Sequence, residues 1–144
     1  MLTLWGRATS SNVQAVMWGL DEMGLEVRRI DAGGRFGGLD DPAYREMNPM
    51  GLVPVLKDGD GPALFESAAI LRYLWGTYGR APFRPDDAGD RAVVDVWAEW
   101  GKHVLCGAFT VPVFWAHWRT PEEDRDTAAV AAAVARFEAL LEIV

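Results

Sequence analysis

The chain has 144 residues, of which half are hydrophobic and 24% are charged, with a formal net charge of −7 and one cysteine. A chain of this length forms one compact domain, or a small domain plus part of a second. One cysteine excludes a disulfide framework, a CxxC redox pair and a cysteine-based zinc site. The negative charge argues against nucleic-acid binding, which needs a basic surface. No uncharged stretch reaches the roughly 20 residues of a membrane span, so we expect a soluble, cytoplasmic protein.

The chain divides into two parts of different composition. Residues 1–79 carry most of the glycines and alternate short apolar runs with amphipathic ones, whereas residues 89–144 are rich in Ala, Val and Trp. The segment between them has the Pro, Gly and charge content of a linker. We predict a sheet-containing domain over residues 1–79, a linker over 80–88 and only helices over 89–144.

The first elements are a strand and a helix. Residues 2–5 form a short apolar run that suits a buried strand. Apolar residues from Val13 to Leu20 then recur at i, i+3, i+4 and i+7, which is one face of a helix. Favoured N-cap residues at 10–12 and a glycine at Gly24 mark its two ends.

A second strand is predicted at residues 26–30 and a short helix at 40–47. The helix has proline at its first position and ends before Pro49, because the residue before a proline is pushed out of the α region. Strands at 53–57 and 63–65 are joined by a Gly- and Asp-rich hairpin turn. With a third helix from about Ser67, the order β-α-β-α-β-β-α predicts a layered α/β sheet domain.

Residues 90 to about 118 are predicted to form one long helix, bent or broken near Pro112. A second helix is predicted to begin at residues 120–123, where Thr, Pro and Glu stand at the cap, first and third positions. An apolar stripe from Val130 to Val144 follows.

Three segments of the first part carry candidate chemistry. The first is Ser10, Ser11 and Asn12, at the start of the first helix. A hydroxyl or amide beside the free N–H groups of a helix N-terminus suits an anion, including a thiolate. Simple helix capping is the alternative.

The second segment is residues 49–56, where a proline interrupts an apolar run. Proline removes a donor from a β ladder, so it belongs at a sheet edge or a bend. A cis Val53–Pro54 bond would turn the Val53 backbone outward, free to pair with an extended peptide-like ligand. A trans proline at a sheet edge is the alternative.

The third segment is Glu66 and Ser67, at the start of the third helix. The Ser67 backbone N–H is suited to a carboxylate, and the Glu66 carboxylate is suited to an ammonium group. Together they would hold the zwitterionic end of an amino acid, although on their own they equally make an ordinary helix start.

In this order and spacing, the segments resemble the glutathione transferase family. Its hallmarks are Pro-x-Gly-x-Val-Pro-x-Leu and Glu-Ser-x-Ala-Ile-x-x-Tyr-Leu, which are present at residues 49–56 and 66–74. The resemblance covers residues 1–79 and continues into the helical part. It implies a thioredoxin-like N-terminal domain followed by an all-α C-terminal domain, which is incomplete here because the chain is shorter than a typical member.

The resemblance also implies roles for the second and third segments. Val53 would hold the cysteinyl part of glutathione through its backbone, with Pro54 cis, while Glu66 and Ser67 would hold the γ-glutamyl end. Arg35 is a possible contact for the glycyl end, because Leu52 stands where many relatives carry a polar side chain; a solvated loop arginine is the alternative.

In serine-type and bacterial members, a hydroxyl just before the first helix donates a hydrogen bond to the glutathione sulfur. Alignment of the helix hydrophobes gives this role to Ser10, with Ser11 and Asn12 as alternatives.

The implied function is that of a detoxification enzyme, a glutathione transferase that transfers the thiolate of bound glutathione to a small electrophile without a metal. A homodimer is expected, and neither nucleic acid nor a membrane is an expected partner. Two alternatives stay open. One is a non-catalytic glutathione-binding or protein-interaction module of the same fold, and the other is a glutathione-dependent disulfide reductase.

Overall fold

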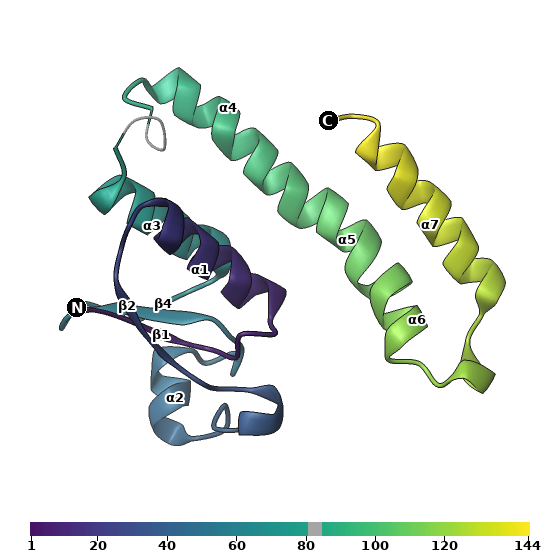
Figure 1. Cartoon of the computed structure of the whole chain (residues 1–144), viewed down its shortest axis with the longest axis horizontal. Coiled ribbons are helices and arrows are strands. Elements are labelled where there is room, and N and C mark those ends of the chain that lie inside the picture. The colour runs from purple at the N-terminus through teal and green to yellow at the C-terminus, as the bar shows by residue number, and fades with distance from the viewer. Residues whose placement is uncertain (81–84) are drawn as a thin grey trace. The chain divides into compact units, whose positions relative to one another are not determined.

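Four short strands form one mixed sheet in the computed structural model, which describes residues 1–80 and 85–144 (Figure 1). The strands are β1 (Leu2–Trp5), β2 (Val27–Ile30), β3 (Val55–Asp58) and β4 (Leu64–Phe65), in the order β2-β1-β3-β4. β1 pairs in parallel with β2 and antiparallel with β3, and β3 pairs antiparallel with β4. The predicted strand order along the chain is confirmed.

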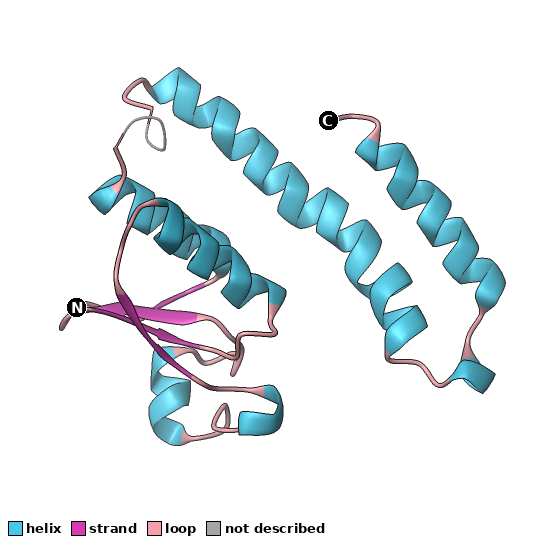
Figure 2. Cartoon of the chain, in the orientation of Figure 1, coloured by secondary structure: helices cyan, strands magenta, loops and turns pink. Residues whose placement is uncertain are grey.

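Helices cover both faces of this sheet. α1 (Ser11–Glu22) and α3 (Ser67–Tyr78) lie on one face, and the short α2 (Pro42–Met47) lies on the other (Figures 1 and 2). Gly24 follows the C-cap of α1, and its φ of 64° lets the Leu25 N–H turn back to the Leu20 carbonyl at 2.9 Å. The predicted β-α-β-α-β-β-α order is therefore present.

The main hydrophobic core lies between the sheet and the α1/α3 pair. Because side chains alternate along a strand, Leu2 and Leu4 of β1 point to this face together with Leu56 of β3, which stands opposite Leu4. Val13, Val16, Leu20, Ile70 and Leu74 of the two helices complete the buried cluster.

A smaller core lies under α2. Val55 of β3 points to this second face, where it packs with the buried Tyr44 of α2 and with Ala32. Trp5, which stands opposite Val55 in the ladder, packs against the same cluster. Both faces of the central strands are thus covered where Leu4 and Trp5 of β1 stand opposite Leu56 and Val55 of β3.

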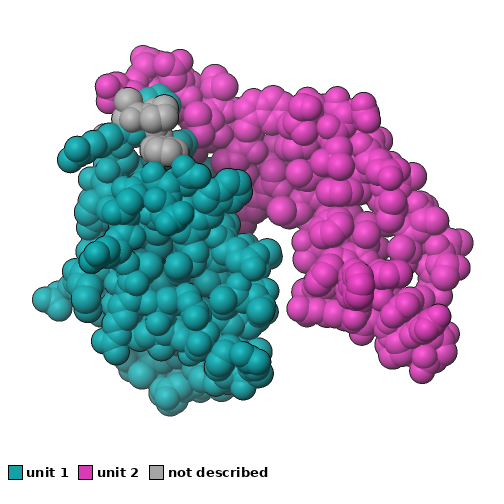
Figure 3. Space-filling view, viewed as in Figure 1, with its two compact units in different colours: residues 1–85 teal, residues 86–144 magenta. Residues whose placement is uncertain are grey.

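The chain divides into two compact units, Met1–Pro85 and Asp86–Val144, which Figure 3 colours separately. Part of the predicted linker, residues 81–84, lies outside the described residues.

The second unit is helical, and its first helical run covers the segment predicted as one long helix. In chain order the run comprises α4 (Ala88–Glu99), η2 (Trp100–Leu105), α5 (Cys106–Phe109), η3 (Thr110–Trp115) and α6 (Ala116–Trp118). The segments η2 and η3 have π-helical hydrogen bonding. Pro112 lies inside η3, so the predicted disturbance takes the form of a π-helical turn, in which the run continues past the proline.

The last helix, α7 (Thr127–Leu141), begins later than predicted. Residues 120–123 do not start it, because Pro121 and Arg125 have extended backbone conformations on either side of the short 3-10 turn η4 (Glu122–Asp124). The cap is Asp126, whose carboxylate accepts from the Ala129 N–H at 2.9 Å.

The apolar stripe of α7 packs on α5 and η3, with the rings of Phe109 and Phe137 4.9 Å apart. Val130 and Val134 are half-buried, whereas Val144 is exposed beyond the end of the helix.

Among the described residues, no helix has both the length and the apolar composition that a membrane crossing requires.

Candidate functional site

The fold brings the three candidate segments together at one end of the strands, where β1 ends and β3 begins. An ideal Cβ on Gly6, in the loop before α1, would stand 3.3 Å from the Val53 Cβ, so the loop that leads to the first segment passes close to Val53. Val55 pairs with Phe65 in the ladder, which sets the Val53–Pro54 segment beside the start of α3. The third contact joins the two helices, because the Ser67 hydroxyl donates to Asn12 Oδ1 at 3.2 Å.

Ser10 occupies the N-cap position of α1. Its backbone is extended, its N–H donates to the Arg7 carbonyl at 3.1 Å, and only 8% of its surface is exposed. The hydroxyl makes no capping hydrogen bond, and no other partner for it is found in the described part of the chain. A nearly buried serine with an uncommitted hydroxyl at a helix N-terminus is a donor available to a ligand.

Ser11 and Asn12 are the first two residues of α1, and both are exposed. The side-chain oxygen Oδ1 of Asn12 already accepts a hydrogen bond from the Ser67 hydroxyl within the protein. Of the three residues predicted for thiol activation, Ser10 is the one that combines burial with a free hydroxyl.

The Val53–Pro54 peptide bond is cis. Among the described residues, neither the N–H nor the C=O of Val53 forms a hydrogen bond. The backbone of this residue is therefore available to an extended partner, as predicted for the cis alternative.

The loop before Val53 is held by two side chains that the sequence analysis did not assign to the site. Asn48, 3% exposed, donates from Nδ2 to the Leu52 carbonyl at 2.9 Å and accepts from the Met50 N–H at 3.0 Å. The Tyr44 hydroxyl donates to the same Leu52 carbonyl at 2.8 Å. Burial raises the pKa of Tyr44 to about 12, so this donor keeps its proton at neutral pH. The proline after Asn48 is the signal that the sequence offers here, and it predicts only the end of the preceding helix.

Glu66 and Ser67 lie at the junction of β4 and α3. Glu66 has φ 68° and ψ 112°, a conformation that residues with a side chain rarely adopt. Such strain costs of order 1–3 kcal/mol and is concentrated at functional sites. Ser67 follows as the first residue of α3, with 8% of its surface exposed.

The N-termini of α1 and α3 differ from those of α2, α4 and α7. Asp41, Asp87 and Asp126 cap α2, α4 and α7 with their own carboxylates. The N-cap residues of α1 and α3, Ser10 and Glu66, make no side-chain cap. The helix ends that meet at this site thus keep their amide groups and positive dipole ends for another acceptor.

Arg35 is exposed on the 3-10 turn η1 (Gly34–Phe36), where its guanidinium stacks over the Phe36 ring at 4.8 Å. The basic side chain packed against this turn is Arg7: a Cβ on Gly34 would stand 3.0 Å from Arg7 Cδ. Nothing in the sequence indicated this position of Arg7, because the contact depends on how the loops pack.

No group of three or more His, Cys, Asp or Glu side chains arranged to hold a metal ion is found within residues 1–80 and 85–144. The site is built instead from hydroxyls, backbone amides and one carboxylate.

A mixed four-stranded sheet with helices on both faces, a cis proline before the third strand and a following helical unit define a thioredoxin-like domain joined to an all-α domain. A family profile described as "Glutathione S-transferase, N-terminal domain" matches residues 9–75. The chain is 40% identical over 141 residues to Glutathione S-transferase GstB of Escherichia coli (strain K12), covering 97% of this chain and 67% of that protein.

Solved structures agree with this result. The chain superposes on the theta class glutathione S-transferase of Xanthomonas axonopodis pv. citri, solved with glutathione bound, with a TM-score of 0.86 and 44% identity over 97% of this chain and 66% of that one. It also resembles poplar glutathione transferase F1, with a TM-score of 0.85 and 25% identity over 99% of this chain and 66% of that one. The chain belongs to the glutathione S-transferase family, a family of enzymes, and spans about two thirds of the length of these relatives.

Proposed function

We propose that this chain is a glutathione transferase that binds glutathione along the three segments and transfers its thiolate to a small electrophile. The observation that carries the proposal is the pair of helix N-termini left without side-chain caps, those of α1 and α3, on either side of the unpaired Val53 backbone. Glutathione presents matching groups, since it has a thiol, a peptide backbone and a zwitterionic γ-glutamyl end.

The γ-glutamyl end is assigned to the start of α3. Its carboxylate accepts from the Ser67 backbone N–H, where the helix dipole favours negative charge. Its ammonium group lies against the Glu66 carboxylate. The cysteinyl part pairs with the N–H and C=O of Val53, as an added strand does at a sheet edge.

For the glycyl carboxylate, Arg35 remains a candidate on the neighbouring turn. It is supported by its charge and its exposure.

The Ser10 hydroxyl is assigned to the sulfur. If the bound thiol has an intrinsic pKa near 8.5, lowering it by about two units takes roughly 2.7 kcal/mol. A helix terminus supplies about 0.3–1 kcal/mol, and a hydrogen bond to a charged group about 1.5–3 kcal/mol. The hydroxyl therefore contributes more than the dipole of α1, and the thiolate it stabilises attacks the electrophile as a nucleophile.

The relatives support glutathione as the ligand and the transferase as the class of enzyme. The theta class enzyme of Xanthomonas was solved with glutathione bound, and the E. coli relative is named a glutathione S-transferase. We further propose that the protein is a cytoplasmic homodimer with a role in detoxification, that it needs no metal, and that its sheet domain, linker and helical domain have the predicted limits 1–79, 80–88 and 89–144.

Calorimetric titration of the full chain with glutathione, followed by a conjugation assay on an aryl halide, tests the function. Micromolar to millimolar binding with turnover supports the transferase, and loss of turnover in a Ser10→Ala variant supports the role of the hydroxyl. Binding without turnover on any electrophile selects the non-catalytic module instead. If glutathione does not bind, both the transferase and the glutathione-binding module are ruled out.

A further inference from the structure

The loop between β1 and α1 carries Ser10 and is held by hydrogen bonds from both its backbone and two side chains. On the side of β2, the Gly6 N–H donates to the Ile30 carbonyl at 2.8 Å and the Arg7 N–H donates to the Ala32 carbonyl at 3.0 Å. These bonds extend the parallel β1–β2 pairing beyond the end of both strands and fix where the loop leaves the sheet.

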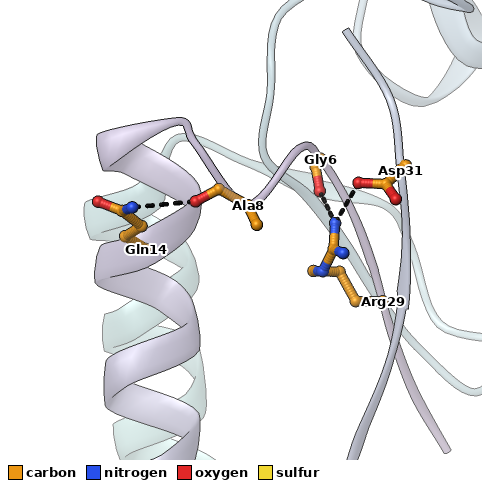
Figure 4. Close-up of polar contacts among 5 residues, drawn as sticks. All are labelled: Gly6, Ala8, Gln14, Arg29 and Asp31. Atoms are coloured by element: carbon orange, nitrogen blue, oxygen red, sulfur yellow. Dashed lines mark hydrogen bonds and ion pairs between the residues drawn. The ribbon is translucent and has the colours of Figure 1, made fainter. Parts of the chain in front are cut away.

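Two side chains also donate hydrogen bonds to backbone carbonyl oxygens of the same loop (Figure 4). Arg29 of β2 donates from Nη1 to the Gly6 carbonyl at 2.8 Å, and Asp31 holds the same nitrogen from the other side at 2.5 Å. Gln14 of α1 donates from Nε2 to the Ala8 carbonyl at 3.0 Å.

Gln14 contacts the loop before Ser10 and also Ser10 itself. Its side chain binds Ala8, two residues before Ser10, and its backbone N–H donates to the carbonyl of Ser10 itself at 2.9 Å. Arg29 lies 23 residues after Gly6, the residue whose carbonyl it contacts. Its side chain is only partly exposed, with 28% of its surface accessible. A hydrogen bond from a guanidinium is stronger than one between neutral groups, so this contact is a firm anchor.

We propose that Arg29 and Gln14 are positioning residues that hold the β1–α1 loop so that the Ser10 hydroxyl points at the glutathione sulfur. The inference rests on the proposed function, since it assigns these side chains to the step in which Ser10 stabilises the thiolate. Neither side chain lies in the segments assigned to the glutathione backbone, the Val53 and Glu66–Ser67 segments.

The physical reason is the steep geometry of hydrogen bonding. A donor moved off the line to its acceptor loses most of its effect below about 120°, and a misplacement of about 1 Å can cost 10²-fold in rate. Loss of either side chain frees one carbonyl of the loop while the β2 backbone bonds and the hydrophobic core remain. The loop is therefore expected to widen its range of positions without unfolding.

The test uses Arg29→Met and Gln14→Met in the full chain, because methionine keeps an unbranched side chain and removes the donor. Arg28→Met is the matched control: Arg28 is the neighbouring arginine of β2, and it is exposed. Arg29→Lys keeps a charged donor on the same strand. The readouts are the pKa of glutathione bound to each variant, followed by thiolate absorbance in the ultraviolet, kcat and KM for glutathione, and the Tm.

We expect Arg29→Met and Gln14→Met to raise the pKa of the bound thiol by about one unit and to lower kcat about tenfold, with KM changed by less than about twofold. Arg29→Lys recovers part of both effects, and Arg28→Met leaves both unchanged. An unchanged thiol pKa in Arg29→Met and Gln14→Met overturns the inference, as does an equal effect of Arg28→Met, which would point to lost positive charge rather than to the loop.

If Arg29→Met fails to fold, the exposed Gln14 decides the question by the same criteria. If Ser10→Ala itself leaves the bound thiol unchanged while glutathione still binds, the assignment of Ser10 fails first, and this result is distinct from a failure of the two positioning residues alone.

Discussion

The Ser67 hydroxyl donates a hydrogen bond to Asn12 Oδ1 at 3.2 Å, which joins the first turn of α3 to the first turn of α1 across 55 residues of sequence. A hydroxyl has one proton, so this bond leaves the Ser67 oxygen free only as an acceptor. In the proposed complex the γ-glutamyl carboxylate then relies on the Ser67 backbone N–H, and the hydroxyl oxygen faces the ammonium group.

Loss of the Asn12–Ser67 bond should weaken glutathione binding in a coupled way. Asn12→Ala and Ser67→Ala should each lower the affinity measured by calorimetry, and the double variant should lose less than both together, with a coupling of about 0.5–1.5 kcal/mol. Asn12→Asp keeps the acceptor and serves as the control for Asn12→Ala. Strictly additive losses would show that the bond does not organise the site.

Ser10→Ala should raise the pKa of bound glutathione by one to two units, because the removed bond contributes about 1.5–3 kcal/mol. The rate of conjugation near pH 7 should fall accordingly, while the calorimetric affinity for glutathione stays nearly intact. Ser11→Ala is the matched control, since Ser11 is exposed on the first turn of α1. If Ser10→Ala leaves the pKa of bound glutathione unchanged while Ser11→Ala or Asn12→Ala raises it, the catalytic role belongs to that other residue.

Two substitutions at Glu66 should separate backbone strain from ligand binding. Glu66→Ala removes the carboxylate but keeps a side chain at φ 68°, whereas Glu66→Gly removes both the carboxylate and the steric cost. Both variants should bind glutathione more weakly. Glu66→Gly should nevertheless unfold at a higher urea concentration than Glu66→Ala, because glycine removes the steric cost of the positive φ. Equal unfolding midpoints would mean that the strain is absorbed elsewhere.

The carboxylate of Asp58 accepts hydrogen bonds from the hydroxyls of Tyr73 and Tyr78, which fasten the second half of α3 to the end of β3. The bond from Tyr78, with that from Tyr73, lowers the pKa of Asp58 below 3.8, and the bond to Asp58 raises the pKa of Tyr78 to about 12. A lowered carboxyl pKa gives stability that is present above the unfolded value and lost as the pH falls through the folded one. A raised phenol pKa gives stability that is present below about 10 and lost as the pH rises toward 12.

Tyr78→Phe should therefore flatten both limbs of the stability curve. Urea midpoints measured from about pH 2 to 5 and from about pH 9 to 12 should change less steeply with pH in this variant than in the unaltered protein. Tyr44→Phe serves as a comparison, because burial rather than Asp58 raises the pKa of Tyr44, so it should flatten the alkaline limb alone. Identical acid limbs for Tyr78→Phe and the unaltered protein would contradict the assignment.

Gly6 should be intolerant of even one extra methyl group. Its φ is 153°, and an ideal Cβ would stand 2.5 Å from Cγ2 of Val13, which is fully buried. Gly6→Ala should destabilise the protein by about 1–3 kcal/mol through overpacking. Gly76→Ala is the control, because nothing lies within 4 Å of its Cβ position in α3 and alanine favours helix. Thermal unfolding of both variants should shift in opposite directions.

Much of the first unit follows from local chemistry. Apolar spacing predicted α1, the proline at Pro42 predicted the start of α2, and Gly24 predicted the end of α1. These signals depend on residues within one turn of one another. The start of α7 was missed because two nearby segments both offer capping chemistry, and the extended backbone of Arg125 decides between them.

The candidate site was only partly predictable for a related reason. The hallmark segments predicted Val53, Glu66 and Ser67 as candidate site residues. Asn48 and Arg29 act through carbonyl oxygens that come near only after folding, 4 and 23 residues away. A sequence does not mark which carbonyl a long polar side chain will reach, so residues of this kind emerge only from the packed chain.

The uncapped ends of α1 and α3 have a consequence for how the protein meets an anion in solution. The chain carries a net charge of −7, so at long range it repels glutathione, whereas backbone dipoles attract only at contact distance. Moderate ionic strength shortens the reach of the repulsion to about 8–10 Å and leaves the contacts themselves almost untouched. Glutathione should thus associate with the protein faster, not slower, as inert monovalent salt is added. A site that attracted anions through surface lysines and arginines would show the opposite salt dependence.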